Sequence, residues 1–271
     1  MADERSGLAK ALSSYSAYGA RGRIGLIAPS TNTTLEPEFW RMAPQGVSVH
    51  VARVHQAGRQ GDPASYQRMA DGIDHAAMLL ATAEVDVVAF GCTSCTYFVP
   101  PEGIRNAMTS RTGRPAILTA DAVLAALREL DVRRVAVAGP RTREVTDREV
   151  SFLSEAGLDV VSAECLGLGT TEEERRYIGR VPLEVAARLA LRADRREADA
   201  VFVSCTQLPT LGVIARLEAE LGKPVVTSNQ ATFWQAVRTI GYGTAIPGFG
   251  ALLERSARMR ASRNGQEGLQ S

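Results

Sequence analysis

The chain carries an internal duplication: four strand-like segments of its first half recur in the same order roughly 110 residues later. Helix-period segments separate these apolar runs at residues 65–83, 142–156 and 182–193. Alternating strands and helices of this kind form parallel sheets with helices on both faces. The matched segments are Arg23–Ala28 with Arg134–Ala138, Val47–Val54 with Leu158–Cys165, Asp86–Cys92 with Asp199–Cys205, and Gly113–Thr119 with Gly222–Thr227. The sequence therefore predicts an α/β protein with two similar parallel-sheet halves; the alternative is one continuous doubly wound sheet without duplication.

The repeat also indicates where the halves begin and end. We expect an N-terminal α/β half over residues 21–120, joined by the C-terminal segment 236–254, and a C-terminal half over residues 121–235. Residues 1–20 are small and polar, and residues 255–271 are basic with glycine and serine. Both ends are therefore expected to be peripheral tails.

Composition and charge exclude several classes of function. The 271 residues are 45% hydrophobic and 23% charged, with a formal net charge of +1, which suits one large or two smaller α/β domains. A near-neutral chain gives no reason to expect nucleic acid or an anionic membrane as a partner. No apolar stretch is long enough to cross a membrane, and the N-terminus lacks the apolar core of a signal peptide. Four cysteines make no disulfide framework, so we expect reduced thiols in a cytoplasmic protein, which could form a homo-oligomer.

Cys92 and Cys205 occupy the same position in the two halves. Each follows an apolar run that opens with aspartate, and each is followed by threonine. Ligands of parallel α/β sheets bind beyond the carboxyl ends of the strands, where both cysteines are expected. A helix N-terminus or a nearby cation can lower a thiol pKa from about 8.5, which activates the thiol at neutral pH. The simpler interpretation, a small buried hydrophobe, is weakened because packing does not require the same residue twice.

Other polar side chains are expected at the same edge of the two sheets. Hydroxyl, amide and backbone N–H donors suit a carboxylate, and an arginine can add charge-assisted hydrogen bonds. If a pseudo-twofold axis relates the halves, these loops converge on one cleft for a small carboxylic acid. The candidate substrate-binding residues are Asn32, Thr93, Ser94, Arg141 and Thr206.

The remaining motifs indicate no metal and no cofactor. Cys92 and Cys95 have the C-x-x-C spacing of redox or zinc sites, but no second such pair exists, and the repeat places Leu208 opposite Cys95. The three histidines show no ligand spacing. The chain contains no dinucleotide-binding glycine motif, Walker loop or nucleophile elbow. We therefore expect a site without metal or cofactor, and no catalytic role for Cys95.

Several motifs resemble those of the aspartate/glutamate racemase superfamily, and within it the maleate cis-trans isomerase and arylmalonate decarboxylase branch. The resemblance spans about residues 21–253, and its most specific part is close to the maleate isomerase signature P-S-S-N-T-T-x-E. It rests on Gly25–Glu36, Gly91–Ser94, Ser204–Thr206, Ile178–Val181 and Ile246–Gly250. The resemblance implies two flavodoxin-like (Rossmann-like) halves related by a pseudo-twofold axis, with a cofactor-independent active site between them.

The same resemblance implies roles for the cysteines. Arylmalonate decarboxylases carry glycine where Cys92 stands, whereas racemases and maleate isomerases keep both cysteines. With the asparagine signature, this favours a cis-trans isomerase of maleate or a related small unsaturated dicarboxylic acid. Cys92 would add as a thiolate to one alkene carbon, and Cys205 would give a proton to the neighbouring carbon and later take it back. Asn32 would hold one carboxylate, and Thr93, Ser94 and Thr206 would offer further donors.

The sequence departs from the family pattern in two places. The family has a carboxylate-binding tyrosine after the fifth strand, where this chain has Arg141, and a family asparagine gives way to the stretch Arg175–Tyr177. Arginine can bind a carboxylate, so a dicarboxylic acid remains compatible with the sequence as the substrate. A larger or differently substituted acid is compatible as well. The alternatives are a racemase of an amino acid, hydantoin or related acid, an arylmalonate-type decarboxylase, and a non-catalytic acid-binding protein.

Overall fold

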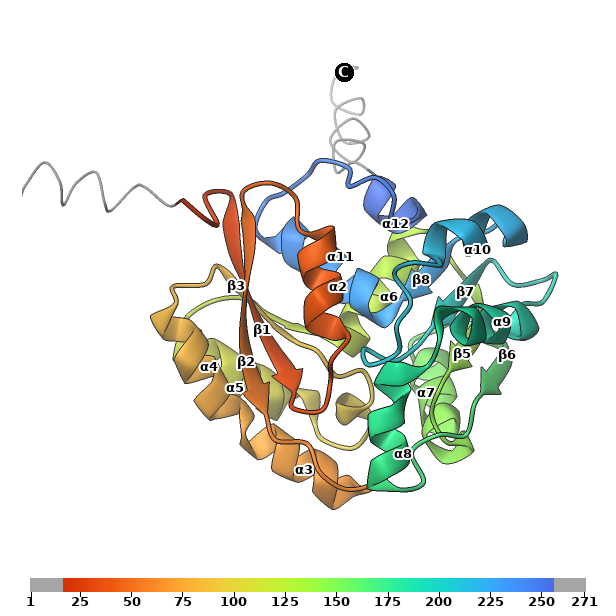
Figure 1. The fold of residues 1–271 in the computed structure, drawn as a ribbon, viewed down its shortest axis with the longest axis horizontal. Helices are drawn as coiled ribbons and strands as arrows, with labels where there is room; N and C mark the ends of the chain where they lie inside the picture. Colours follow the sequence, from red (N-terminus) through yellow and green to blue (C-terminus); the bar gives the residue numbers. More distant parts are fainter. Residues whose placement is uncertain (1–16, 256–271) are drawn as a thin grey trace, which may run out of the picture.

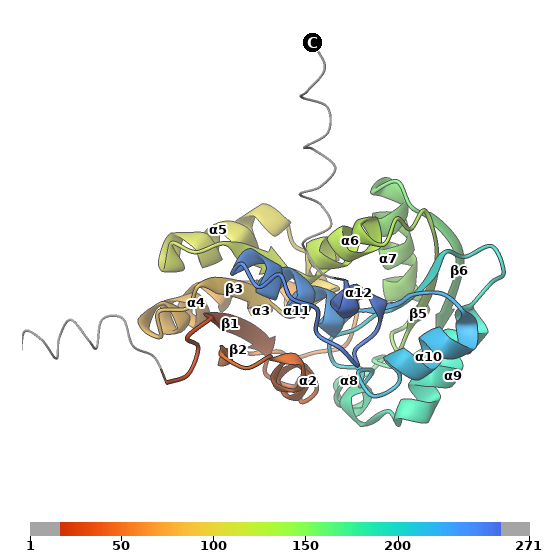
Figure 2. The ribbon, with the colours of Figure 1, turned by 90° about the horizontal axis from the view of Figure 1, so that it is seen from above.

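The computed structural model describes residues 17–255 of the chain. The expected tails, 1–20 and 255–271, lie outside the described residues except for residues 17–20 and 255. Figures 1 and 2 show the described part as two lobes with helices between them.

The elements of the two lobes follow one another in the order that the repeat predicts. The first half contains β1 (Gly22–Pro29), α2 (Leu35–Met42), β2 (Val47–Val54), α3 (Pro63–Asp71), α4 (Ile73–Thr82), β3 (Val87–Phe90), the 3-10 turn η1 (Cys95–Tyr97), α5 (Pro101–Thr112) and β4 (Ala116–Leu118). There follow α6 (Thr119–Glu129), β5 (Arg134–Gly139), α7 (Arg143–Glu155), β6 (Asp159–Cys165), α8 (Glu172–Tyr177), the 3-10 turn η2 (Ile178–Arg180), α9 (Leu183–Ala193), β7 (Ala200–Val203), α10 (Ile214–Leu221), β8 (Val225–Thr227), α11 (Ser228–Thr239) and α12 (Ala251–Glu254).

The strands of the described residues form two separate four-stranded sheets with the same topology. Their orders are β2-β1-β3-β4 and β6-β5-β7-β8, and all neighbouring strands run parallel. Each strand of the first sheet therefore has an equivalent in the second sheet: β1 corresponds to β5, β2 to β6, β3 to β7 and β4 to β8. This result confirms the predicted α/β fold with two parallel-sheet halves, and the alternative of one continuous sheet is wrong.

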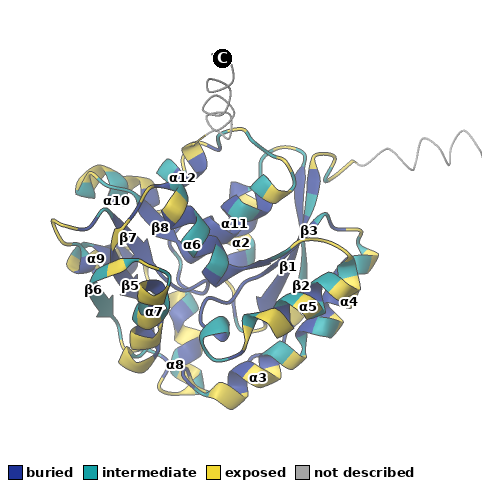
Figure 3. Cartoon of the chain, turned by 180° about the vertical axis from the view of Figure 1, so that it is seen from behind, coloured by how far each residue is buried: buried dark blue, intermediate teal, exposed yellow. Residues whose placement is uncertain are grey.

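Helices bury both faces of each sheet, which explains why the central strands read as continuous apolar runs. In β1, Ile24 and Leu26 pack into the core between the lobes, whereas Ile27 packs with α3, α4 and α5 on the outer face. Figure 3 shows the central strands buried, the edge strand β6 half-buried, and the outward stripes of α3, α4 and α7 exposed.

Helices α6 and α11 hold the two lobes together. Although α11 follows β8 of the second sheet, it contacts β1, β3 and β4 of the first sheet and packs along α6 (Figures 1 and 2). Where α11 meets α2, the rings of Phe39 and Phe233 pack edge to face with their centroids 5.3 Å apart. Such a pair contributes about 0.5–1.5 kcal/mol beyond the area it buries. One hydrophobic core runs through both halves, so the loops between them are held in a fixed relation.

A buried carboxylate adds a polar contact between the lobes. Glu38 on α2 accepts hydrogen bonds from the backbone N–H groups of Thr210 (2.8 Å) and Leu211 (2.9 Å). Its second oxygen accepts a hydrogen bond from Asn229 Nδ2 (2.7 Å). Burial raises the pKa of Glu38, while these three donors oppose that rise by favouring the ionised form. The contact fixes the segment that follows Cys205 in the chain.

Replacing Glu38 with alanine should lower the free energy of unfolding by about 3–5 kcal/mol, because three buried donors lose their acceptor. Glu36→Ala is the matched control, since Glu36 pairs with Arg53 at a partly exposed position, where an ion pair contributes at most about 1 kcal/mol. Urea unfolding of the two variants and the unaltered chain measures the difference. Similar small losses in both variants would contradict the role of Glu38 as a contact between the lobes.

Candidate active site

One polar cavity lies where loops after β1, β3, β5 and β7 meet, beyond the carboxyl ends of these strands. Its free volume is only about 20 Å³, so its walls lie close together and it suits at most a small molecule. All seven residues proposed from the sequence line this one cavity. The lining residues are Pro29, Asn32, Gln56, Gln60, Cys92, Thr93, Ser94, Arg141, Cys205, Thr206 and Gln207.

Cys92 follows Gly91 at the end of β3 and is 5% exposed. A Cβ atom on Gly91 would lie 2.0 Å from Leu35 Cδ2, so glycine allows the backbone to pass close to α2. Hydrogen bonding by the Cys95 thiol, together with the charge of Arg141, lowers the pKa of Cys92 to about 6, although burial opposes this shift. The lowered pKa favours the thiolate form of Cys92 at neutral pH.

Cys95 has a place beside Cys92 that the sequence did not predict. It is the first residue of η1, it is fully buried, and its Sγ lies 3.8 Å from the carbonyl oxygen of Tyr66. The neighbouring Cys92 sulfur raises the pKa of Cys95, so Cys95 stays protonated, and its one thiol proton faces two acceptors, the Tyr66 carbonyl oxygen and the Cys92 sulfur. The C-x-x-C spacing is visible in the sequence, but the η1 turn is what brings the second thiol back to the first.

Cys205 follows Ser204 at the end of β7 and adopts a strained backbone conformation. Its φ angle of +97° is rare for a residue with a side chain and costs about 1–3 kcal/mol. The Cys205 N–H donates to Ser228 Oγ (3.0 Å), and Thr93 Oγ1 donates to the same oxygen (3.0 Å). Because Ser228 is the first residue of α11, this one hydroxyl joins the cysteine loops of the two halves.

Arg141 is a buried cation held by a polar cluster. Its Nη1 donates to Ser204 Oγ (3.0 Å) and lies 3.4 Å from Glu149 Oε1. The same Glu149 oxygen accepts hydrogen bonds from Ser204 Oγ (2.5 Å) and from Tyr97 OH (2.9 Å). Burial alone would lower the pKa of Arg141, but interaction with the acidic groups around it, Cys205 and Glu149 foremost, outweighs burial and the pKa is raised. The guanidinium stays charged, and its Nε has no hydrogen-bond partner among residues 17–255.

Asn32 links the start of α2 to the cysteine loop of the other half. Its Oδ1 accepts hydrogen bonds from the N–H groups of Thr34 and Leu35, both at 3.0 Å, which forms an Asx-type turn just before α2. Its Nδ2 donates one hydrogen to Thr206 Oγ1 (3.1 Å). An amide nitrogen carries two hydrogens, so one remains for a ligand.

The predicted hydroxyl donors are largely engaged within the protein. Thr93 donates its hydroxyl proton to Ser228, and Thr206 donates its own to the carbonyl oxygen of Gly91 (2.9 Å). The backbone N–H groups of Thr93, Ser94 and Thr206, by contrast, make no hydrogen bond within the described part of the chain. These N–H groups are therefore the donors that the two cysteine loops can offer to a carboxylate.

Three glutamines in the cavity wall were not predicted. Gln207 follows Thr206, and its Nε2 donates to the carbonyl oxygens of Thr31 (3.3 Å) and Arg175 (3.2 Å). Gln56 and Gln60 lie in the segment after β2. This segment follows the carboxyl end of a parallel strand, where ligands of such sheets bind, so its position could have indicated it. The segment itself contains no recognisable motif.

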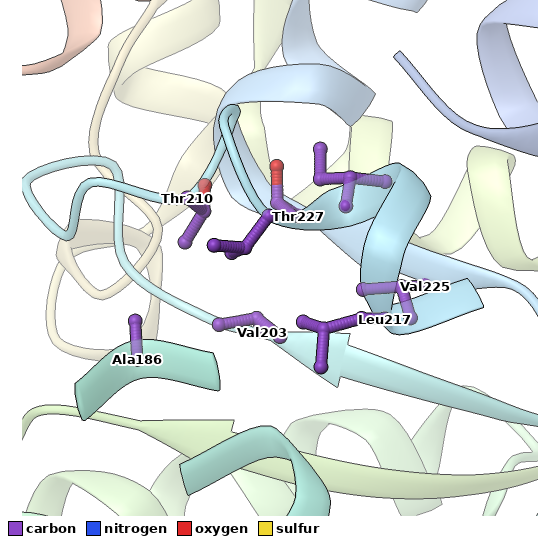
Figure 4. A pocket seen from close by; sticks show the side chains of 8 residues that line it. Ala186, Val203, Thr210, Leu217, Val225 and Thr227 are labelled. Carbon is purple, nitrogen blue, oxygen red and sulfur yellow. The ribbon is translucent and has the colours of Figure 1, made fainter. Parts of the chain in front are cut away.

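A second pocket lies beside β7 and β8, is apolar, and leaves no room for even a water molecule (Figure 4). Its walls contain no charged side chain and no thiol, so it offers nothing to hold or transform an acid. The lining residues are Ala186, Val203, Thr210, Val213, Ile214, Leu217, Val225 and Thr227.

The described residues contain neither a candidate metal site nor a candidate membrane-spanning helix. No three His, Cys, Asp or Glu side chains between residues 17 and 255 are grouped so that they could hold a metal ion. No helix in the same range combines the length and the apolar character needed to span a membrane.

Comparison with known proteins identifies the relatives of this chain. The family model for arylmalonate decarboxylases matches residues 24–253. A maleate isomerase of Geobacillus stearothermophilus is 26% identical over 248 residues, which cover 85% of this chain and 96% of the relative. An arylmalonate decarboxylase of Bordetella bronchiseptica is 40% identical over 153 residues, which cover 55% of this chain and 62% of the relative.

Solved structures give the same result for the fold. A cysteine-to-serine variant of the maleate cis-trans isomerase of Nocardia farcinica, with a covalently bound succinylcysteine intermediate, matches with a TM-score of 0.78 and 25% identity. The match covers 86% of this chain and 98% of that structure. These findings confirm the predicted resemblance to the maleate isomerase and arylmalonate decarboxylase branch.

Cys92 should react as a thiolate near neutral pH. Because its pKa is lowered to about 6, the rate of its alkylation by iodoacetamide should rise with pH through a midpoint near 6. Cys95→Ala removes the largest cause of the low pKa, so the midpoint should move upward by about one pH unit or more. Mass spectrometry of the labelled Cys92 peptide gives the rate at each pH.

The matched control for this measurement is Cys165→Ala, which removes a half-buried cysteine on β6, outside the cavity. Its Cys92 profile should coincide with that of the unaltered chain. An unchanged midpoint in Cys95→Ala would contradict the hydrogen bond between the two thiols.

Proposed function

This chain belongs to the arylmalonate decarboxylase family, and we propose that within the family it is a cofactor-independent cis-trans isomerase of maleate or a closely related small unsaturated dicarboxylic acid. One observation supports this proposal most strongly: a single small cavity is lined by two thiols, one from each half of the molecule. The pKa of Cys92 is lowered to about 6, so the cavity combines a nucleophile with a second sulfur, that of Cys205, for proton transfer.

The reaction would proceed by addition, rotation and elimination. The Cys92 sulfur adds to one alkene carbon, and the electron pair of the double bond moves to the neighbouring carbon, which takes the proton of Cys205. The new carbon–carbon single bond then rotates by half a turn. Cys205, now a thiolate, removes the proton again, and the bond between sulfur and carbon breaks. The trans acid leaves, and both cysteines return to their starting states. The succinylcysteine in the Nocardia farcinica relative is the kind of adduct that this addition would form.

The other residues of the cavity would bind the two carboxylates. The permanently charged Arg141 can pair with one of them, and the second hydrogen of Asn32 Nδ2 can hold an oxygen of the other. The backbone N–H groups of Thr93, Ser94 and Thr206 can take up the negative charge that moves toward a carboxylate when sulfur adds. In this role Arg141 would replace the tyrosine of the resembled family.

Cys92→Ala and Cys205→Ala should each lower the rate of maleate conversion by about three orders of magnitude or more. The two cysteines act as a unit, so removing either one abolishes the function of both. Cys165→Ala, outside the cavity, is the matched control and should keep full activity. Proton NMR follows the appearance of fumarate from maleate. The proposal fails if the unaltered chain forms no fumarate at high enzyme concentration, or if either cavity cysteine can be removed without loss.

Decarboxylation is the second candidate, because the family model and the 40% identical segment are both those of arylmalonate decarboxylases. The presence of Cys92, where the resembled decarboxylases have glycine, and the small cavity argue against it. Release of carbon dioxide from phenylmalonate, without any conversion of maleate, would favour decarboxylation. Exchange of an α-hydrogen with heavy water in a chiral amino acid or hydantoin would favour the racemase alternative instead.

A further inference from the structure

We propose that Gln60 is a ligand-binding residue whose side-chain amide donates a hydrogen bond to a carboxylate of the acid in the cavity. The proposal rests on the proposed function only in taking the ligand to be a carboxylic acid. Gln60 is 4% exposed, lines the cavity, and comes from the segment between β2 and α3.

Tyr66 determines which end of the Gln60 amide is available. The Tyr66 hydroxyl oxygen lies 2.6 Å from Gln60 Oε1 and 3.0 Å from Ser94 Oγ. An amide oxygen can only accept, so the single hydroxyl proton of Tyr66 is donated to Gln60. Burial raises the pKa of Tyr66 to about 12, and its ring stacks on Phe98 with centroids 4.6 Å apart, so this donor is permanent and fixed in place.

The same chain of hydrogen bonds removes Ser94 as a hydroxyl donor. Since the Tyr66 proton is directed at Gln60, the contact between Tyr66 and Ser94 requires Ser94 to donate. The Gln60 Nε2 group has no hydrogen-bond partner among the described residues, and its oxygen is occupied by Tyr66. In this corner of the cavity, the amide of Gln60 therefore takes the place of the predicted hydroxyl of Ser94 as the side-chain donor.

The position of Gln60 is shaped by residues of the other half. Its N–H donates to the carbonyl oxygen of Gly169 (2.9 Å), and a Cβ atom on Gly169 would lie 2.3 Å from Gln60 Cγ. Gly169 also has a φ angle of +99°, so only glycine meets both requirements. Arg175, which is 1% exposed, donates from Nη1 to the carbonyl oxygens of Ala57 (2.8 Å) and Gly58 (2.7 Å). The segment that carries Gln60 is therefore held against the cavity from across the interface of the halves.

The neutral amide of Gln60 would contribute one charge-assisted hydrogen bond to a carboxylate in the cavity. Loss of one hydrogen bond to a charged group weakens binding roughly tenfold to a hundredfold. A carboxylate in place of the amide would add repulsion between like charges. The two substitutions Gln60→Met and Gln60→Glu should therefore both weaken acid binding, and the second should weaken it at least as much as the first.

The test measures protection of Cys92 from iodoacetamide by succinate and by malonate, which have no double bond and cannot be isomerised. Each variant is compared with its own alkylation rate without acid, so a change in thiol reactivity does not enter. Gln60→Met should need roughly ten to a hundred times more acid for half-protection than the unaltered chain. Gln45→Glu is the matched control, because Gln45 is an exposed glutamine before β2, away from the cavity, and its half-protection should be unchanged.

Two results would overturn the inference: half-protection of Gln60→Met at the same acid concentration as the unaltered chain, or no protection of the unaltered chain by either acid. Gln60→Met decides the question even if a buried glutamate prevents Gln60→Glu from folding. Conversion of maleate is scored separately. If the unaltered chain converts maleate and Gln60→Met is protected normally, the inference is rejected and the proposed function stands. If the unaltered chain does not convert maleate but Gln60→Met loses protection, the inference stands and the proposed function is rejected.

Discussion

Two buried chains of hydrogen bonds join the cysteine loops of the two halves, and the chemistry of the cavity depends on them. The first runs from Asn32 through Thr206 to the carbonyl of Gly91, and the second joins Thr93 and Cys205 through Ser228. Each crosses between residues that lie more than 100 positions apart in the sequence. Both are shielded from water, so a broken link would leave polar groups unsatisfied at a cost of about 1–3 kcal/mol each. Two sulfur atoms that follow strands of separate sheets are thereby held at one cavity.

The duplication supplies two cysteines, and departures from the repeat make them unequal. Beside Cys92 the chain has Cys95, whose thiol stabilises the thiolate, whereas the equivalent position beside Cys205 is Leu208. Gly91 in one half corresponds to Ser204 in the other, where the hydroxyl joins the cluster of Arg141 and Glu149. Symmetric placement of the sulfur atoms and asymmetric surroundings are together what an addition coupled to proton transfer requires.

The fold and the location of the cavity could be predicted from the sequence, because both depend on local patterns. Apolar runs such as Val87–Phe90 recur at a fixed offset, and residues just beyond parallel strands must lie at one edge of the sheet. The remaining parts depend on contacts between distant segments. Nothing in the sequence places Glu149, in the middle of α7, beside Arg141, or brings Gly169 under Gln60. The sequence also does not show where the hydroxyl protons of Tyr66 and Ser94 point. Their direction depends on a neighbouring atom, the Gln60 amide oxygen, that can accept a hydrogen bond but not donate one.

The central claim is that Cys92 attacks the ligand while Cys205 moves the proton. Intact-protein and peptide mass spectrometry of Cys205→Ser after incubation with maleate tests it most directly, because a serine hydroxyl is too weak a base at neutral pH to take the proton back and release the adduct. The account predicts a mass gain of one maleate, located on Cys92. Absence of an adduct in a variant that still binds maleate, or an adduct on Cys95 instead, would contradict it.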